Sequence, residues 1–215
     1  MGKLKFSASV SLDGFSAGPD QSRDDPLGVG GMALHEWVFA TRTFHAMQGQ
    51  EGGSGGLDDR EAGAWSDDTG ATIMGRNMFG PIRGEWPDEP WNGWWGDDPP
   101  FHTPVFVLTH HPREPVEMQG GTTFHFVTDG IEAALELALD AAGGRDVSIG
   151  GGAATAQQYL RAGLVDMMRI HVTPVLLSAG ERLFDGVGAT LSAFECVELV
   201  SSPAVALFTY VRKGS

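Results

Sequence analysis

The sequence predicts one α/β domain over 1–215, built on a mixed, mostly parallel β-sheet with helices on both faces. Short apolar stretches typical of buried strands alternate with stretches of helical periodicity through most of the chain. The last two stretches, 194–200 and 204–211, alternate apolar and polar residues and predict a C-terminal antiparallel hairpin. At 215 residues, 41% of them hydrophobic, the chain is long enough for one well-packed domain.

The first half of the chain supplies two predicted strands and one predicted helix. Residues 4–10 alternate as a strand, and 32–47 carry apolar residues at helical spacing. Residues 49–60 hold five glycines and have no apolar face, so they predict a mobile loop. Residues 71–74 form a short apolar strand, and 85–102 form a loop rich in tryptophan and proline.

The second half alternates strands and helices more regularly. Residues 131–142 place apolar side chains at 131, 135, 138, 139 and 142, the spacing of an amphipathic helix. The remaining expected elements are strands at 105–108, 124–127, 147–149 and 167–175 and a helix at 154–162.

The charge balance excludes one class of partner and restricts another. The chain has 14 Lys and Arg against 28 Asp and Glu, a formal net charge of −14. Nucleic acid is not expected to bind, because its phosphates are held by clustered cations. A smaller anionic ligand would need helix N-termini, backbone N–H groups and a few local cations.

The first residues, the lengths of the apolar runs and the single cysteine bear on the location and redox chemistry of the protein. Residues 1–5 enter a strand without a signal-peptide pattern, and no apolar run is long enough to span a membrane, so a soluble, cytoplasmic protein is expected. Cys196 has no partner for an internal disulfide, and its alternating surroundings predict a buried small apolar residue without a redox role.

Three glycines, Gly150 to Gly152, stand between an apolar strand and a predicted helix. Such a turn exposes N–H donors and the positive end of the helix, which suits a pyrophosphate. A tight strand-to-helix turn explains the same glycines without a ligand. The usual dinucleotide pattern G-x-G-x-x-G is absent, because its third glycine position is Thr155.

Two further strand ends carry groups suited to a nucleotide. In "TIMGRNMFGPI" (72–82), Gly75 permits close approach and Arg76 offers a bidentate cation, although an ordinary surface ion pair would also explain the arginine. In "PVFVLTHHPRE" (104–114), the strand ends in Thr109, His110 and His111. Adjacent histidines do not have metal-chelating spacing, and no metal site is expected.

In this order, the three strand ends resemble the dihydrofolate reductase fold. The chain is more closely similar to the reductase domain of the bifunctional riboflavin-biosynthesis enzyme, the RibD C-terminal domain, and its stand-alone bacterial relatives. The resemblance covers nearly the whole chain and rests on "SVSLDGFSAGPD", "MGRNMF", "PVFVLTHHP", "IGGGAATAQQYLRAGLVDMMRIHVTPVLLSAGERLF" and the terminal hairpin. It implies a three-layer dihydrofolate reductase-like domain.

The resemblance also implies a cofactor, NADPH, and the residues around it. The strand-end glycines of the family include a cis Gly-Gly bond, expected here between Gly150 and Gly151, and face the cofactor pyrophosphate. The implied cofactor-binding residues are Ala8, Ala17, Gly18, Gly75, Arg76, Asn77, Met78, Leu108, Thr109, His110, Ile149, Gly150, Gly151, Gly152, Ala153, Ala154, Thr155 and Gln157.

Two positions depart from the pattern of the relatives. Many relatives carry a threonine two places after the arginine of "GR", where this chain has Met78, so a phosphate contact is lost or made by backbone. At the adenosine end, Thr109 and His110 occupy places that serve a 2′-phosphate in relatives, and a neutral histidine is a weaker phosphate ligand than arginine. Arg113 lies close enough in sequence to assist, which favours NADPH over NADH.

The substrate side offers three candidate catalytic residues. Dihydrofolate reductases bind the pterin through one carboxylate on the first helix, which implies Glu36, or alternatively His35, in "ALHEWVFATR". A solvated helix residue would explain Glu36 equally well. Asp13 in "SLDG" is expected to cap the loop over the nicotinamide or to touch substrate. His171 points into the cleft or is a satisfied core histidine.

Tryptophans 86, 91, 94 and 95 stand among acids and prolines. We expect them to cover a planar ligand as a lid or to be buried in a subunit contact.

The resulting hypothesis is an NADPH-dependent reductase that delivers hydride to a C=N or C=O group of a small planar heterocycle, such as a pterin or a pyrimidine. The alternatives are a flavin-binding reductase and a non-catalytic nucleotide-binding protein on the same fold. Few basic residues accompany Asp13 and Glu36, which favours an unphosphorylated substrate. A homodimer is expected, because the riboflavin-pathway relatives form dimers and the chain has apolar surface to cover.

Overall fold

The computed structural model describes residues 2–64, 68–80, 84–87 and 91–214. The chain divides into two compact units, one made of residues 1–6 and 68–166 and the other of residues 7–67 and 167–215. The division falls inside strand β1 (Leu4–Ser11), so each unit combines two separate parts of the sequence. A single domain over 1–215 remains a prediction.

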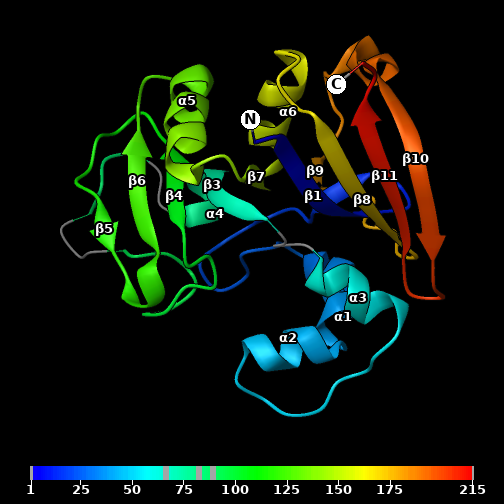
Figure 1. Cartoon of the computed structure of the whole chain (residues 1–215). Coiled ribbons are helices and arrows are strands. Elements are labelled where there is room, and N and C mark those ends of the chain that lie inside the picture. The colour runs from blue at the N-terminus through cyan, green and yellow to red at the C-terminus, as the bar shows by residue number, and fades with distance from the viewer. Residues whose placement is uncertain (1, 65–67, 81–83, 88–90, 215) are drawn as a thin grey trace. The chain divides into compact units, whose positions relative to one another are not determined.

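The first unit is built on a mostly parallel sheet (Figure 1). Residues 4–6 of β1 pair in parallel with β7, and β7, β3, β4 and β6 follow as parallel neighbours, while β5 is antiparallel to β6. The strands are β3 (Thr69–Gly75), β4 (Pro104–Leu108), β5 (Val116–Glu117), β6 (Thr123–Val127) and β7 (Asp146–Gly151).

Helices α5 (Ile131–Ala142) and α6 (Ala153–Arg161) pack on this sheet, and α4 (Arg76–Phe79) follows β3 directly. The buried face of α5 consists of alanines, and the neighbouring strand residue Gly70 is so close that an added Cβ would meet the backbone of Ala142. The buried Tyr159 hydroxyl of α6 donates a hydrogen bond to the carbonyl of Ile131 at 2.8 Å. The two predicted helices are therefore present and joined to each other. A short 3-10 helix, η2 (Gln119–Gly121), follows β5.

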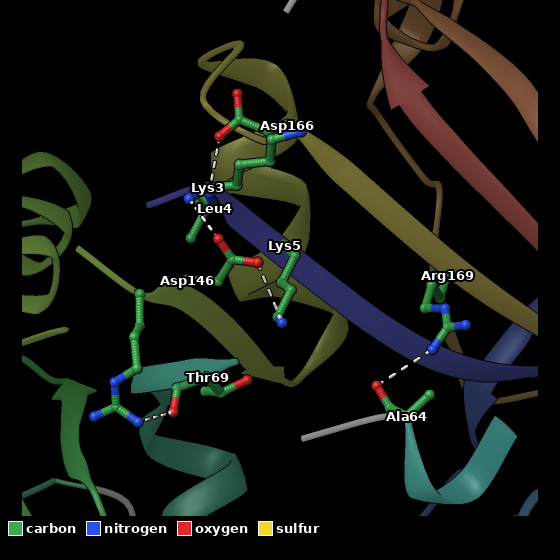
Figure 2. Close-up of polar contacts among 9 residues, drawn as sticks. Lys3, Leu4, Lys5, Ala64, Thr69, Asp146, Asp166 and Arg169 are labelled. Atoms are coloured by element: carbon green, nitrogen blue, oxygen red, sulfur yellow. Dashed lines mark hydrogen bonds and ion pairs between the residues drawn. The ribbon is translucent and has the colours of Figure 1, made fainter. Parts of the chain in front are cut away.

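Two carboxylates fasten the start of β1 within the first unit (Figure 2). Asp146 accepts a hydrogen bond from the N–H of Lys3 at 2.8 Å and pairs with the Lys5 ammonium at 3.3 Å. Asp166 accepts a hydrogen bond from the N–H of Leu4 at 2.8 Å. Because Lys5 is almost fully buried, its charge needs this partner.

The second unit holds the C-terminal strands. Its strand order is β10, β11, β8 and the remainder of β1, and β11 is antiparallel to both β8 and β10. The strands are β8 (Met167–Thr173), β10 (Phe194–Ser201) and β11 (Ala206–Arg212), with the 3-10 helix η3 (Gly188–Ala193) before β10. The predicted C-terminal hairpin is confirmed.

The expected helix over 32–47 is wrong as one element. The structure has a 3-10 helix η1 (Gly31–His35), then α1 (Glu36–Phe39) and α2 (Arg42–Met47). Thr41 explains the break: its hydroxyl donates to the carbonyl of Val38 at 2.6 Å and accepts from the N–H of Phe44 at 3.2 Å. One side chain thus ends α1 and caps α2.

The expected loop over 49–60 ends earlier than predicted, because helix α3 (Leu57–Gly63) begins inside it. Contacts from distant residues hold this helix. Asp59 accepts a hydrogen bond from the N–H of Thr43 at 2.7 Å, and Glu61 pairs with Arg169 of β8 at 3.0 Å. Arg169 also donates to the carbonyl of Ala64 at 3.3 Å (Figure 2). The composition of residues 57–63 does not indicate these partners.

Two very short strands, β2 (Phe15–Ala17) and β9 (Glu181–Arg182), pair with each other as a separate antiparallel sheet and were not predicted. The fold class is nevertheless confirmed: a mixed, mostly parallel sheet with helices and a C-terminal antiparallel pair of strands.

Candidate functional site

Three parallel strands of the first unit end beside one another. Strands β7, β3 and β4 are neighbours, and their registers align Gly75 with Leu108 and Gly151 with Met74. Arg76 follows β3, Thr109 follows β4, and the glycine turn before α6 follows β7. The three segments selected from the sequence therefore meet at the carboxyl edge of one sheet, where α/β proteins commonly bind ligands.

Arg76 and Thr109 contact each other at this edge. The half-buried Arg76 guanidinium donates a hydrogen bond from Nη1 to the Thr109 hydroxyl at 3.4 Å. That hydroxyl is buried and accepts a further hydrogen bond from the N–H of His111 at 3.2 Å. A guanidinium fork beside a hydroxyl is a donor set suited to phosphate oxygens.

The glycine turn combines a conformational requirement with open space. Gly151 has a φ of 111°, a conformation that L side chains rarely adopt. A Cβ built there would meet, among the described atoms within 4 Å, only the sulfur of Met78 at 3.7 Å. Gly152 caps α6 without a side-chain hydrogen bond, and the first N–H groups of a helix have no partner inside it. Both readings of the glycines, turn and anion cradle, fit this geometry.

The cis peptide bond lies between Gly151 and Gly152. The expected position, between Gly150 and Gly151, is wrong by one residue. Three consecutive glycines contain two Gly-Gly bonds, and the sequence does not distinguish them.

Packing between β3 and α6 explains the glycine at position 75. A Cβ at this position would collide with the hydroxyl of Thr155, which is buried in the first turn of α6. Thr155 thus lies against the end of β3, and the missing side chain of Gly75 lets α6 approach that strand. Asn77 in α4 is exposed, whereas Met78 is half-buried against the core around Phe79.

The other residues implied in cofactor binding differ in exposure. In the first unit, Ile149 and Ala153 are buried, Leu108, Gly150 and Gln157 are half-buried, and His110 and Ala154 are exposed. In the second unit, Ala8 on β1 is half-buried, and Ala17 on β2 and Gly18 are buried. A Cβ on Gly18 would collide with the backbone of Val29, which shows that this glycine permits two loops to cross.

Asp13 holds two loops of the second unit together. Its carboxylate accepts hydrogen bonds from the Ser11 hydroxyl at 2.6 Å, the N–H of Ser178 at 2.7 Å and the N–H of Leu177 at 3.2 Å. The Ser11 hydroxyl and these backbone donors hold the pKa of the Asp13 carboxyl at about 2. Asp13 is therefore ionised at neutral pH and suited to capping the 175–178 turn.

His171 lies on β8 and is 1% exposed. Its ring stacks on Trp37 with centroids 4.7 Å apart, and Nδ1 lies 3.4 Å from the Ser7 hydroxyl. Burial, with a smaller contribution from the positive charge of Arg169, lowers the pKa of His171 to about 4. The imidazole is therefore neutral at physiological pH and packs as part of the interior of the second unit.

The first helical segment presents its carboxylate to solvent. Glu36 at the start of α1 is exposed, whereas Trp37 points inward and donates from its indole N–H to the buried Ser9 hydroxyl at 3.1 Å. His35 is half-buried, its Nδ1 atom is enclosed, and burial lowers its pKa. Of the two candidates on this segment, Glu36 thus faces solvent and His35 is partly enclosed.

The RibD C-terminal domain model matches residues 3–205 of the chain. The chain belongs to the RibD C-terminal domain family. No curated protein matches it in sequence.

Solved structures show the same fold at low sequence identity. A protein assigned to riboflavin biosynthesis from Shewanella sp. PV-4 is 21% identical with a TM-score of 0.59, over 98% of this chain and 99% of that one. RibD of Acinetobacter baumannii is 16% identical with a TM-score of 0.57, over 99% of this chain and 58% of that one. Dihydrofolate reductase from Enterococcus faecalis, solved with NADP(H), is 14% identical with a TM-score of 0.53, over 99% and 97% of the two chains.

In this RibD C-terminal domain, three of the four loop tryptophans pack against the chain itself. Trp86, Trp91 and Trp95 join the core cluster of Phe79 and Phe124 in the first unit. The indole of Trp91 also donates to the carbonyl of Phe79 at 2.9 Å, and Trp94 contacts Trp91 edge to face. Their own core thus accounts for the buried part of these side chains, and a lid over a ligand or a subunit contact stays a prediction. Residues 88–90 of the loop lie outside the described residues.

Arg113 serves the same loop. Its guanidinium donates to the carbonyl of Trp91 at 2.6 Å and to the Asn92 side chain at 3.0 Å. The expected help to a 2′-phosphate would therefore compete with these bonds. The ring of Trp86 lies against Arg76, a contact that the sequence did not indicate, because the two residues stand ten positions apart with no shared periodicity.

The prediction for Cys196 is wrong: the thiol is exposed. It lies on β10, the outer strand of its sheet, and the pairing with β11 shifts between Cys196 and Glu198. A bulge on an edge strand removes the simple in-and-out alternation on which the prediction rested.

Among the described residues, no group of three or more His, Cys, Asp or Glu side chains is arranged to hold a metal ion. Within the same residues, each helix is too short or too polar to cross a membrane.

Proposed function

We propose that the chain is an NADPH-dependent reductase acting on a C=N or C=O group of a small planar heterocycle. Membership of the RibD C-terminal domain family and a fold shared with dihydrofolate reductase support an oxidoreductase. One observation carries the cofactor assignment: three neighbouring strand ends bring Arg76, Thr109 and the glycine turn of α6 to one edge of the first unit.

The donor set at this edge fits the phosphates of a dinucleotide. The positive φ of Gly151 and the open space over it leave room for a pyrophosphate beside the N-terminal N–H groups of α6. Arg76 and the Thr109 hydroxyl would hold a further phosphate, which distinguishes NADPH from NADH. When bound, NADPH would supply the hydride. The chain itself orients the phosphates with local groups, since its net charge of −14 repels anions at long range.

The residues of the second unit suit different roles on the substrate side. The Asp13 carboxylate is ionised and accepts three hydrogen bonds, so it positions a loop and is a poor proton donor. His171 is enclosed and neutral, so it supports the interior. Glu36 is the sequence candidate whose carboxyl remains open to solvent and to a ligand, and we propose it as the group that binds or protonates the substrate.

Titration of the purified protein with NADPH and NADH, followed by cofactor fluorescence, tests the proposal. We expect tighter binding of NADPH and a loss of roughly tenfold or more in NADPH affinity for Arg76→Ala, because a charge-assisted hydrogen bond to phosphate is removed. NADPH consumption with a pterin or pyrimidine, reduced in Glu36→Gln without a change in NADPH affinity, would support the reductase.

Equal NADPH affinity in wild type and Arg76→Ala would remove Arg76 from the site. Tight NADPH binding without turnover of any pterin or pyrimidine would favour a non-catalytic nucleotide-binding protein. A yellow purified protein would favour a flavin-binding reductase.

We also propose a homodimer in the cytoplasm. The exposed apolar side chains of β10 support the first part of this proposal, because an outer strand can pair with a second copy.

A further inference from the structure

Trp86 carries a contact that its role in the core does not explain. In a chain with twice as many acidic as basic residues, the guanidinium carbon of Arg76 lies 3.7 Å from the centre of the Trp86 ring. The guanidinium carbon of Arg113 lies 5.1 Å from the same ring. Two of the few cations in the first unit therefore gather at one indole, close enough for cation–π attraction.

The Trp86 ring is fixed in place. Its indole N–H donates to the carbonyl of His111 at 2.9 Å. Phe126 and Phe79 pack against it edge to face, with centroids 5.1 and 5.9 Å away. The ring therefore presents a rigid face to whatever side chain lies on it.

The two arginines use this face differently. Arg113 directs two N–H groups to the Trp91 carbonyl and the Asn92 side chain and so belongs to the loop. Arg76 lies between the Trp86 ring and the Thr109 hydroxyl, at the strand ends. Stacking occupies the flat face of a guanidinium, while its N–H donors point outward in the plane, the geometry that recognises phosphate.

We infer that Trp86 is a positioning residue that fixes the Arg76 guanidinium for the 2′-phosphate of NADPH and thereby sets the preference for NADPH over NADH. This inference rests on the proposed function. The Trp86 ring restricts the rotamers of a long side chain before the ligand arrives, which lowers the entropy lost on binding. Since the ring acts through Arg76, its removal affects the phosphorylated cofactor and has no effect once Arg76 is absent.

A double-mutant cycle with Trp86→Leu, Arg76→Ala and the double variant tests the inference. NADPH and NADH affinities are measured by fluorescence titration and corrected for the folded fraction seen in circular dichroism. We expect Trp86→Leu to weaken NADPH about fivefold and NADH less than about twofold, in line with the size of a cation–π contact. In the Arg76→Ala background, the same change should alter NADPH affinity by less than about twofold.

Trp95→Leu is the matched control, because Trp95 packs against Phe101 and Phe124 in the same loop and core. It should lower the melting temperature while leaving the NADPH to NADH ratio at the wild-type value. Trp86→Phe keeps a ring under Arg76 and should retain most of the preference, which provides a second variant if Trp86→Leu does not fold.

The outcomes separate the inference from the proposed function. Equal losses for NADPH and NADH in Trp86→Leu, or an undiminished loss in the Arg76→Ala background, would show a purely structural role and overturn the inference alone. Loss of preference in Trp95→Leu as well would do the same. A wild-type protein that binds neither cofactor would overturn the proposed function and the inference with it.

Discussion

Met78 lies where a single side chain can change the affinity of the proposed site for NADPH. It stands two residues after Arg76, and its sulfur faces the open side of Gly151, where the proposed pyrophosphate would lie. We expect Met78→Thr to bind NADPH more tightly than Met78→Val, by about threefold to tenfold. The two side chains have nearly the same shape, and only threonine can donate a hydrogen bond to phosphate.

Isothermal titration of both variants measures the effect of the hydroxyl directly. Since the variants make the same cavity in the core around Phe79, their melting temperatures should agree closely. Identical NADPH affinities would place the pyrophosphate away from Met78 and Gly151.

His171 makes the stability of the chain depend on pH. Its folded pKa of about 4 lies below the unfolded value of 6.5, mainly because of burial. The unfolded chain therefore binds a proton first as pH falls, so the stabilisation is complete above pH 6.5 and is lost progressively towards pH 4. The shift corresponds to a loss on the order of 3 kcal/mol.

Urea unfolding at several pH values between 4 and 7 measures this loss. His171→Asn should flatten the dependence of the unfolding free energy on pH, while His110→Asn, at an exposed position, controls for the removal of one histidine. A curve for His171→Asn as steep as that of the wild type would contradict the assignment to His171.

At the scale of residues, the sequence identified the residues of the candidate site but did not predict the side chains that contact them. Arg76, Thr109 and Gly151 follow directly from strands that are readable as short apolar runs, and the structure brings them to one edge. The Trp86 ring contacts Arg76 from ten positions away in sequence, and the 177–178 turn donates hydrogen bonds to Asp13 from 164 and 165 positions away. Such partners depend on the path of irregular loops, which periodicity does not encode.

Elements were predictable where their own residues determine them. Helix α5 has the predicted bounds, 131–142, because its apolar face is regular and long. The 32–47 segment has similar spacing but is broken at Thr41, whose hydroxyl ends one helix and caps the next. Helix α3 depends on Arg169 from a distant strand, so its own composition indicated a loop. A local side-chain cap overrides the helical spacing in the first case, and a tertiary contact overrides local propensity in the second.

The turn between β7 and α6 allows the two explanations of its glycines to be separated. Gly151→Ala introduces strain whatever the ligand, because φ is 111° there. Gly163, just after α6, has a φ of 71° and open space around it, so Gly163→Ala is a matched control for backbone strain. We expect each substitution to destabilise the chain by roughly 1–2 kcal/mol, but only Gly151→Ala to weaken NADPH per folded molecule.

Melting temperatures and NADPH titrations of the two variants provide the measurement. A Gly151→Ala protein that is destabilised but binds NADPH normally would mean that the glycines serve the turn alone.

At the scale of the whole molecule, the chain order of strands and helices was predictable and the division into units was not. Both units are made of distant segments, and the boundary lies within the continuous strand β1. The alternation of residues 4–10 continues across this boundary, so the sequence carries no signal at the residue where one unit ends. The short strands β2, β5 and β9 were missed for a related reason, since two or three residues are too few to establish a period.

The prediction for the whole molecule is a homodimer formed through β10. Three of the loop tryptophans pack against their own core, and the exposed apolar side chains elsewhere include Val197 and Leu199, which are 54% and 60% exposed. Both lie on β10, the first strand in the order of the described sheet, whose outer backbone groups can pair with a second copy. We expect light scattering at micromolar concentration to give the mass of two 22.9 kDa chains.

Charged substitutions locate the interface. Val197→Glu together with Leu199→Glu should yield a monomer, because two carboxylates would be buried without partners on pairing. Met47→Glu, a change of the same kind at a 58% exposed position on α2, should leave the dimer intact. A wild-type monomer would contradict the dimer itself. A dimer that survives both β10 substitutions would instead place the contact on another surface and leave the exposed apolar residues of this edge strand without a function.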